Sequence, residues 1–152
     1  MKITFEPPIL VWFRQDLRCT DHPALVAAAA TGRPVVPVFI LDDETPARWR
    51  PGGAGRWWLH HSLACLAQSL GALAGRRADD FALVLRRGQS ERTLRDVIAD
   101  TGATSVFWNR CYEPYAVARD KRTKEALGRD GIEVRSFNAS LLFEPWTVQT
   151  AQ

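Results

Sequence analysis

Ionisable side chains of alternating sign follow the first apolar run of the sequence. Arg14, Asp16, Arg18 and Asp21 fall within eight residues, directly after the run at residues 9–13. Guanidinium and carboxylate groups at this spacing can pair with one another, or they can hold a polar ligand through charge-assisted hydrogen bonds. Both interpretations stay open, because a loop braced by Asp16, Arg18 and Asp21 would also preorganise Arg14 to bind a ligand.

Acidic and amide side chains follow two further apolar runs. Asp42, Asp43 and Glu44 come after residues 35–41, and Asn109 and Glu113 come after residues 105–108. Carboxylates can accept hydrogen bonds from a ribose or from the amino-pyrimidine edge of a pterin, and they can equally cap a turn or a helix. Together with Arg14, these five residues are the candidates for cofactor binding.

The sequence lacks the residues that a phosphate-binding loop, a metal site or a nucleophilic active site would need. The first loop contains neither GxGxxG nor GxxxxGK[ST], the patterns that cradle a dinucleotide or a nucleoside triphosphate. His60 and His61 are adjacent, so on a helix they point about 100° apart and cannot chelate one metal ion. The only other histidine is His22, and no nucleophile is placed beside any of the three. We expect neither a metal site nor a catalytic residue.

The candidate residues lie between alternating strand and helix patterns. Proline after a capping residue predicts a helix start at Asp21–Pro23, and leucines spaced by three and four residues predict the second helix. The expected strands are residues 9–13, 35–41, 81–85, 105–108 and 133–137. The expected helices are residues 24–30, 56–73, 90–102 and 114–131. Pro37 inside the second strand indicates an irregular or edge position.

This alternation predicts an α/β fold, a Rossmann-like doubly wound sheet of five parallel strands with helices on both faces. In such sheets, ligands bind beyond the carboxyl ends of the strands. We therefore expect the loops after the first, second and fourth strands to meet and to form the site.

Composition bounds the class of protein. With 152 residues, 46% apolar and 24% charged, the chain suits one globular domain. The net charge of +3 is too small to indicate nucleic-acid binding, so we expect no direct contact with DNA. Three cysteines without a CxxC pair suit the reducing cytoplasm, and no segment reaches the length of a membrane span.

Six tryptophans are a high content for this length. Large aromatic side chains usually belong to a core, and we expect this of Trp57 and Trp58, with an interface as the second interpretation. A domain that docks on a partner or holds a planar chromophore would need them too.

Four motifs, in order along the chain, resemble those of the DNA photolyase/cryptochrome family. They are LVWFRQDLR with DHPAL (residues 10–18 and 21–25), GAGRWWLHHSL (53–63), VFWNRCYEPY (106–115) and FNASLLFEPW (137–146). The resemblance implies that residues 1–146 form the N-terminal α/β domain of this family. Residues 147–152 then begin a linker to a helical domain that binds FAD.

In that family, as the resemblance implies, the helical domain repairs cyclobutane pyrimidine dimers in light, and the N-terminal domain can hold an antenna chromophore. This chain alone is then not catalytic. Its partner is the helical domain, and apolar surface left bare by that domain's absence would favour self-association. The alternatives are a cryptochrome photoreceptor domain, a stand-alone nucleotide-binding domain, and a docking module.

The resemblance leaves the antenna chromophore open. One folate-binding branch has an Asn-Glu pair where this chain has Tyr115 and Ala116, whereas another has an acidic residue that falls on Glu44. Deazaflavin-binding members carry Asp-x-Glu where this chain reads Cys111-Tyr112-Glu113. Methenyltetrahydrofolate is therefore the preferred chromophore, with a deazaflavin or FMN as the alternatives and FAD confined to the helical domain.

Overall fold

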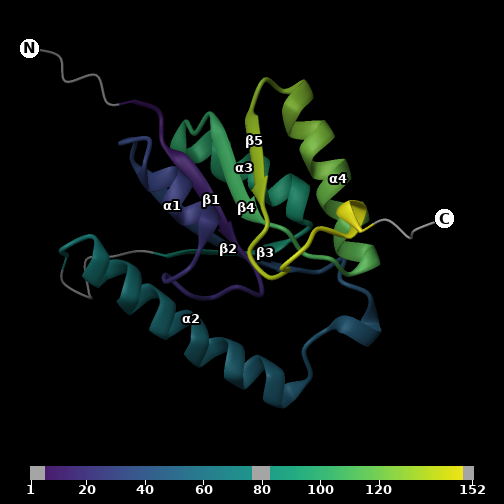
Figure 1. The fold of residues 1–152 in the computed structure, drawn as a ribbon. Coiled ribbons are helices and arrows are strands. Elements are labelled where there is room, and N and C mark those ends of the chain that lie inside the picture. Colours follow the sequence, from purple (N-terminus) through teal and green to yellow (C-terminus); the bar gives the residue numbers. More distant parts are fainter. Residues whose placement is uncertain (1–5, 77–82, 149–152) are drawn as a thin grey trace, which may run out of the picture.

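The computed structural model describes residues 6–76 and 83–148, which form one parallel sheet with helices on both faces (Figure 1). The sheet order is β3-β2-β1-β4-β5, and every pairing is parallel. This confirms the predicted fold class. The strands are β1 (Ile9–Phe13), β2 (Val35–Asp42), β3 (Val84–Gly88), β4 (Ser105–Asn109) and β5 (Glu133–Phe137). The helices are α1 (Pro23–Ala29), α2 (Gly53–Leu73), α3 (Ser90–Thr101) and α4 (Pro114–Arg129), with short 3-10 turns η1 (Ala47–Trp49) and η3 (Pro145–Thr147).

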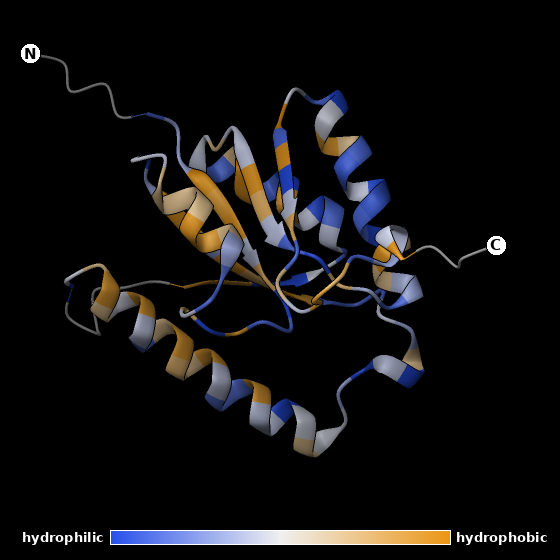
Figure 2. Ribbon diagram, in the orientation of Figure 1, coloured by the Kyte–Doolittle hydropathy of each residue, from blue (hydrophilic) through white to orange (hydrophobic). Residues whose placement is uncertain are grey.

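The central strands β1 and β4 are buried along their whole length. Successive side chains of a strand point to opposite faces, so each central strand feeds two separate cores. Leu10 and Trp12 pack with α3 and α4 on one face, while Ile9, Val11 and Phe13 pack with α1 and α2 on the other. Burial on both faces explains why these strands are rich in apolar residues, most clearly β1, which is largely orange in Figure 2.

The third strand lies further along the chain than predicted. β3 spans Val84–Gly88, not residues 81–85, and Phe81 and Ala82 lie outside the described residues. Arg86 and Arg87, which follow the predicted strand, lie within β3. β3 is an edge strand whose side chains reach solvent, so arginines fit there and the apolar pattern is weak.

Pro37 does not mark an edge strand, because β2 pairs with β1 on one side and with β3 on the other. Pro37 lies opposite Val11 of β1, and the pairing with β3 begins one residue later, at Val38. The proline therefore precedes the part of β2 that has two neighbours.

The start of α1 differs from the prediction in its capping residue. His22, not Asp21, caps α1: its Nδ1 accepts a hydrogen bond from the backbone N–H of Leu25 at 3.1 Å. Asp21 instead adopts the left-handed conformation, with φ of 49°. Ser90 is the first residue of α3 and is fully buried, so it follows the cap at Gln89. Gly102 ends α3 in the left-handed region as predicted, with φ of 68°.

Helix α2 packs on the sheet through its C-terminal half only. Leu66 and Leu70 are buried in the core with α1, whereas Leu73 is exposed, so the leucine stripe is only partly a core stripe. Residues 53–58 are all exposed, and Figure 1 shows this end of α2 lying away from the sheet. Trp57 and Trp58 are 63% and 69% exposed, so the expectation that they belong to the core is wrong.

Apolar and polar residues are interspersed along the 21 residues of α2, as Figure 2 shows. Across the described ranges, we find no helix that is both long enough and apolar enough to cross a membrane.

Candidate functional site

A cavity of about 940 Å³ lies where β1 and β2 end, between the sheet and the N-terminal half of α2. Its lining comes from the end of β1 and the loop after it, the end of β2 and the loop after it, Arg87 of β3, the first turns of α2, Cys111 in the loop after β4, and α4. The predicted meeting of the three loops at one edge is therefore observed. The aromatic residues on its lining are Trp12, Phe39, Trp49, Trp58 and Tyr115.

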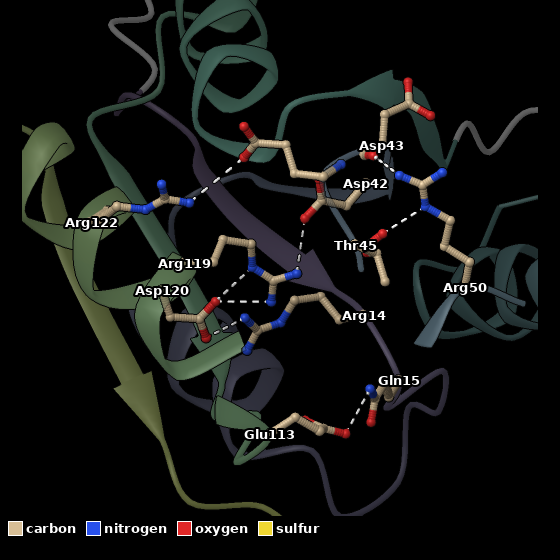
Figure 3. A network of polar contacts seen from close by, with 11 residues as sticks. Arg14, Gln15, Asp42, Asp43, Thr45, Arg50, Glu113, Arg119, Asp120 and Arg122 are labelled. Atoms are coloured by element: carbon tan, nitrogen blue, oxygen red, sulfur yellow. Dashed lines mark hydrogen bonds and ion pairs between the residues drawn. The ribbon is translucent and has the colours of Figure 1, made fainter. Parts of the chain in front are cut away.

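Ion pairs between buried side chains form the part of the lining nearest the sheet (Figure 3). Asp120 of α4 binds Arg14 at 2.5 Å and Arg119 at 2.9 Å, and Arg119 also binds Asp42 at 3.1 Å. Burial alone lowers the pKa of Arg119, but the neighbouring Asp120 and Asp42 outweigh it and raise that pKa above its usual value. Arg119 therefore stays charged, and its charge is compensated inside the protein.

Arg14 lies within this network and is 8% exposed. Besides pairing with Asp120, it donates a hydrogen bond to the backbone carbonyl of Asn109, which links the ends of β1 and β4. Its guanidinium carbon lies 4.6 Å from the centre of the Trp12 ring, a cation–π contact. Its Nε has no acceptor among the described residues, although Arg14 lines the cavity.

Asp16 is held by a second cluster behind the same edge. The Asn109 amide donates to Asp16 at 2.7 Å, the backbone N–H of Arg14 donates to it at 2.9 Å, and His22 Nε2 lies 2.9 Å away. Burial alone raises the pKa of Asp16, but the contacts to His22, Arg14 and Asn109 outweigh it and lower the pKa to about 2. Because His22 Nδ1 accepts from Leu25, the ring proton belongs on Nε2, facing the carboxylate.

Several candidate residues thus have internal partners. Asn109 also accepts a hydrogen bond from the backbone N–H of Ala24, which fixes the start of α1. Arg18 donates to the carbonyl of Asp21 and to that of Ala139. No partner for the Asp21 side chain is seen in the described part of the chain. Asn109 and Glu113 line a smaller hollow of about 410 Å³, where Gln15 donates to Glu113 at 3.0 Å.

The acidic loop after β2 divides into an inner and an outer part. Asp42 faces Arg119, whereas Asp43 and Glu44 are exposed and lie near Arg87 at 2.9 Å and Arg122 at 3.7 Å. Arg14, Asp42 and Asp43 line the cavity, and Glu44 lies on neither hollow. Arg50 donates to the carbonyls of Thr45 and Asp43, so it holds the loop in its turn (Figure 3).

Arg119 and Asp120 are the residues that the sequence reasoning missed. The buried positions of α4 are Ala116, Arg119, Thr123, Ala126 and Leu127, spaced by three and four residues. An arginine inside such a stripe is the signal that could have indicated a buried partner for Arg14. Trp49 and Tyr115 carried no signal, because only the folded loop brings their rings to 5.8 Å from one another.

The site offers neither a metal centre nor an activated thiol among the residues described. Across residues 6–76 and 83–148, no group of three His, Cys, Asp or Glu side chains could hold a metal ion. Burial raises the pKa of the Cys111 thiol, so it remains protonated at neutral pH and is a poor nucleophile. The arrangement can bind and orient a ligand that is planar, polar and at least partly aromatic.

Comparison with known proteins gives a consistent result. The sequence pattern of the DNA photolyase family matches residues 9–152. The chain is 50% identical over 143 residues to a deoxyribodipyrimidine photo-lyase of Agrobacterium fabrum, covering 94% of this chain and 28% of that protein. It is 45% identical over 140 residues to cryptochrome-1 of Arabidopsis thaliana, covering 91% of this chain and 20% of that protein. The chain thus spans less than a third of each of these relatives.

Solved structures agree in fold. A bacterial class III photolyase from Agrobacterium tumefaciens superposes with a TM-score of 0.83 at 48% identity, covering 99% of this chain and 29% of the other. An archaeal photolyase from Sulfolobus tokodaii, described with two FAD molecules and a novel light-harvesting cofactor, superposes with a TM-score of 0.76. At 23% identity, covering 94% of this chain and 32% of the other, the second match supports the fold alone.

Proposed function

This chain belongs to the DNA photolyase family, and from that premise we propose that its 940 Å³ cavity holds the antenna chromophore of a light-driven DNA repair enzyme. Relatives in the family bind FAD and an antenna chromophore. When bound, such a chromophore supplies absorbed excitation to a flavin elsewhere in the protein.

The observation that carries the proposal is the cavity itself. Its volume lies within the range of about 300–1,000 Å³ that small-molecule sites occupy. Trp58 and Trp49 are exposed on its lining, where in a simple globular domain they would be buried. A planar ring system between α2 and the sheet would cover both faces of this gap and would exclude water from the aromatic side chains.

Methenyltetrahydrofolate is the chromophore that we propose first, with a deazaflavin or FMN as the alternatives. Arg14 and Asp42 are fixed by their ion pairs and would shape the inner end of the site. Asp43 is exposed at the cavity, where Arg87 already donates to both of its carboxylate oxygens, and its remaining lone pairs could accept hydrogen bonds from an amino-pyrimidine ring. Glu44 lines neither hollow, so it would contact only a ligand that reaches beyond the cavity. Asn109 and Glu113 would contact only a ligand that extends to the smaller hollow.

For the whole protein, we propose repair of cyclobutane pyrimidine dimers in a helical domain that binds FAD and packs against this one. A cryptochrome photoreceptor is the second candidate, favoured by the 45% identity to a plant cryptochrome. Exposed apolar side chains near the C-terminal end, Leu142, Phe143 and Trp146, would serve as the contact with the helical domain.

The antenna proposal is tested by titrating the chain with methenyltetrahydrofolate. Binding should quench tryptophan fluorescence and change the near-UV absorption of the folate. Trp58→Ala should weaken binding about tenfold, since an aromatic stacking partner contributes about 0.5–1.5 kcal/mol in addition to the apolar area that it buries. Trp146→Ala is the matched control, because Trp146 is as exposed as Trp58 and does not line the cavity.

Two results would defeat the proposal in different ways. No binding of folate, FMN or deazaflavin at tens of micromolar concentration would remove the antenna function itself. Equal weakening by both tryptophan variants would place the ligand outside this cavity. For the whole protein, loss of pyrimidine dimers from irradiated DNA under blue light separates a photolyase from a cryptochrome.

A further inference from the structure

We infer that residues 45–50, in the loop after β2, form a flap over the cavity, and that the contact between Trp49 and Tyr115 holds this flap shut. The inference rests on the proposed antenna function and adds how a ligand would enter and leave the site. Thr45, Trp49 and Arg50 of the flap line the cavity.

The flap is braced by hydrogen bonds within the loop itself. Arg50 donates to the carbonyl of Thr45 at 2.6 Å and to the carbonyl of Asp43 at 2.9 Å (Figure 3). The backbone N–H of Trp49 donates to the carbonyl of Pro46 at 2.8 Å, at the turn η1. These bonds do not have to break when the flap moves, so it can move as one body.

Polar contacts do not fasten the flap to the rest of the domain. In the described part of the chain, no hydrogen bond or ion pair links residues 46–50 to another helix or strand. Asp43 pairs with Arg87 before the flap begins, and these side chains are 50% and 73% exposed. The pair of Glu44 with Arg122 is longer, at 3.7 Å, and is also open to water. Exposed ion pairs of this kind contribute little, so another contact must hold the flap.

The chain that follows the flap is equally free of the sheet. Residues 53–58 at the start of α2 are all exposed, and Gly52 and Gly53 have open space around them. Small residues at the end of an element often serve as the hinge of a moving loop. The outer wall of the cavity is thus fixed where β2 ends and again at Leu66, where α2 enters the core.

Trp49 is the residue of the flap that contacts the opposite wall. Its ring centre lies 5.8 Å from that of Tyr115, with an angle of 34° between the planes. Tyr115 lies in the first turn of α4, and the guanidinium of Arg119, fixed in the ion-pair network, lies 6.0 Å from its ring. An aromatic pair of this kind favours the shut flap by a factor of about two to twelve. The contact therefore holds the flap and can still open.

Opening the flap would change access to the whole site. Trp49 lines both hollows, as do Gln15 and Cys111, so the shut flap lies where the two hollows meet. A shut flap blocks both the entry and the exit of a ligand. Weakening the contact should therefore raise the rates of association and dissociation together, with little change in Kd.

The first experiment measures opening without a ligand, by limited digestion with trypsin. Trypsin cleaves after arginine unless proline follows, so it can cleave the flap after Arg48 but not after Arg50, which precedes Pro51. Cleavage requires an extended segment, so its rate follows the population of the open flap. Tyr115→Ala should raise the rate of cleavage after Arg48 about two- to twelvefold. Val117→Ala is the matched control, because Val117 is exposed on α4 and does not line the cavity.

The second experiment measures the binding rates of methenyltetrahydrofolate and of FMN by stopped-flow fluorescence. Trp49→Ala should raise the association and the dissociation rate by a similar factor, up to about twelvefold. Trp146→Ala should change neither rate, because Trp146 is exposed and lines neither hollow. Loss of a mere ligand contact would raise the dissociation rate alone, which separates gating from binding.

The outcomes distinguish the flap from the antenna proposal. An unchanged rate of cleavage after Arg48 in Tyr115→Ala overturns the flap, whichever ligand binds. A rise in the dissociation rate alone in Trp49→Ala makes Trp49 a ligand contact, which overturns the gating role and leaves the antenna proposal standing. If the chain binds neither probe, the antenna proposal fails and the gating role fails with it.

Discussion

Replacing Asp120 by asparagine tests whether the buried ion-pair network holds the site edge together. The carboxylate of Asp120 binds both Arg14 and Arg119, and the three side chains are 13%, 6% and 11% exposed. The substitution keeps the shape but removes the charge, so among the described residues Arg119 keeps Asp42 as a carboxylate partner and Arg14 keeps none. Breaking a buried pair in this way costs about 3 kcal/mol or more.

That cost should be visible as a lower melting temperature. For a domain of this size, each kcal/mol corresponds to roughly 2–4 °C, so we expect Asp120→Asn to melt about 9 °C below the parent. Circular dichroism at 222 nm, followed at pH 7 during heating, measures it. Asp130→Asn is the control, because Asp130 pairs with Arg95 at the exposed surface and should change the melting temperature little.

A second variant tests the mechanism. Adding Arg14→Met to Asp120→Asn removes the buried charge that has lost its carboxylate partner, so the double variant should recover part of the lost stability. If Asp120→Asn melts within about 2 °C of the parent, the network does not depend on its charge, and the reasoning is refuted. If the double variant is less stable than the sum of both changes, unpaired charge is not what destabilises the single variant.

Three further predictions concern acid stability, a helix end and association. The pKa of Asp16 is lowered from 3.8 to about 2, so its ionised carboxylate stabilises the folded state fully above pH 4. This stabilisation is lost as the pH falls through 2. At pH 7, Asp16→Asn should therefore be less stable than the parent by about 2 kcal/mol, measured by urea unfolding. Between pH 4 and pH 2 the variant should lose less unfolding free energy than the parent, and an equal loss in both proteins would contradict this. Gly102→Ala should lower stability by about 1 kcal/mol, because φ is 68° there, whereas Gly128→Ala, in the last turn of α4 with open space around it, should not. Finally, the 152-residue chain should self-associate through Leu142 and Phe143 on size-exclusion chromatography, and Phe143→Ser should reduce this, so a strictly monomeric parent would count against it.

Most of the fold could be predicted from the sequence because the central strands are buried on both faces. β1 and β5 have the predicted bounds, and the other predicted strands except the third differ by one residue. β3 could not be placed well, since an edge strand with Arg86 and Arg87 has no apolar run. The family membership expected from four ordered motifs is confirmed.

The site was predictable only in its location. The rule that ligands bind at the carboxyl ends of parallel strands brought Arg14 and Asp42 to one cavity. It could not show that both have buried partners in α4. Asp120, the partner of Arg14, is 106 residues away in the sequence, and Arg119, the partner of Asp42, is 77 residues away. The exposure of Trp58 was also beyond prediction, since composition does not tell which half of α2 packs on the sheet.

The uneven packing of α2 links the occupancy of the cavity to the dynamics of the helix. Residues around Leu66 and Leu70 share the core, so their amides should exchange hydrogen only when much of the domain opens. Amides in the first turns have no such support and should exchange faster. A ligand bound against Trp58 and Arg56 would stabilise these turns and so slow their exchange, and the tighter the ligand binds, the slower the exchange becomes. By reciprocity, a protein surface that packs on α2 at Trp57 and binds only the ordered helix would bind the loaded chain more tightly than the empty one.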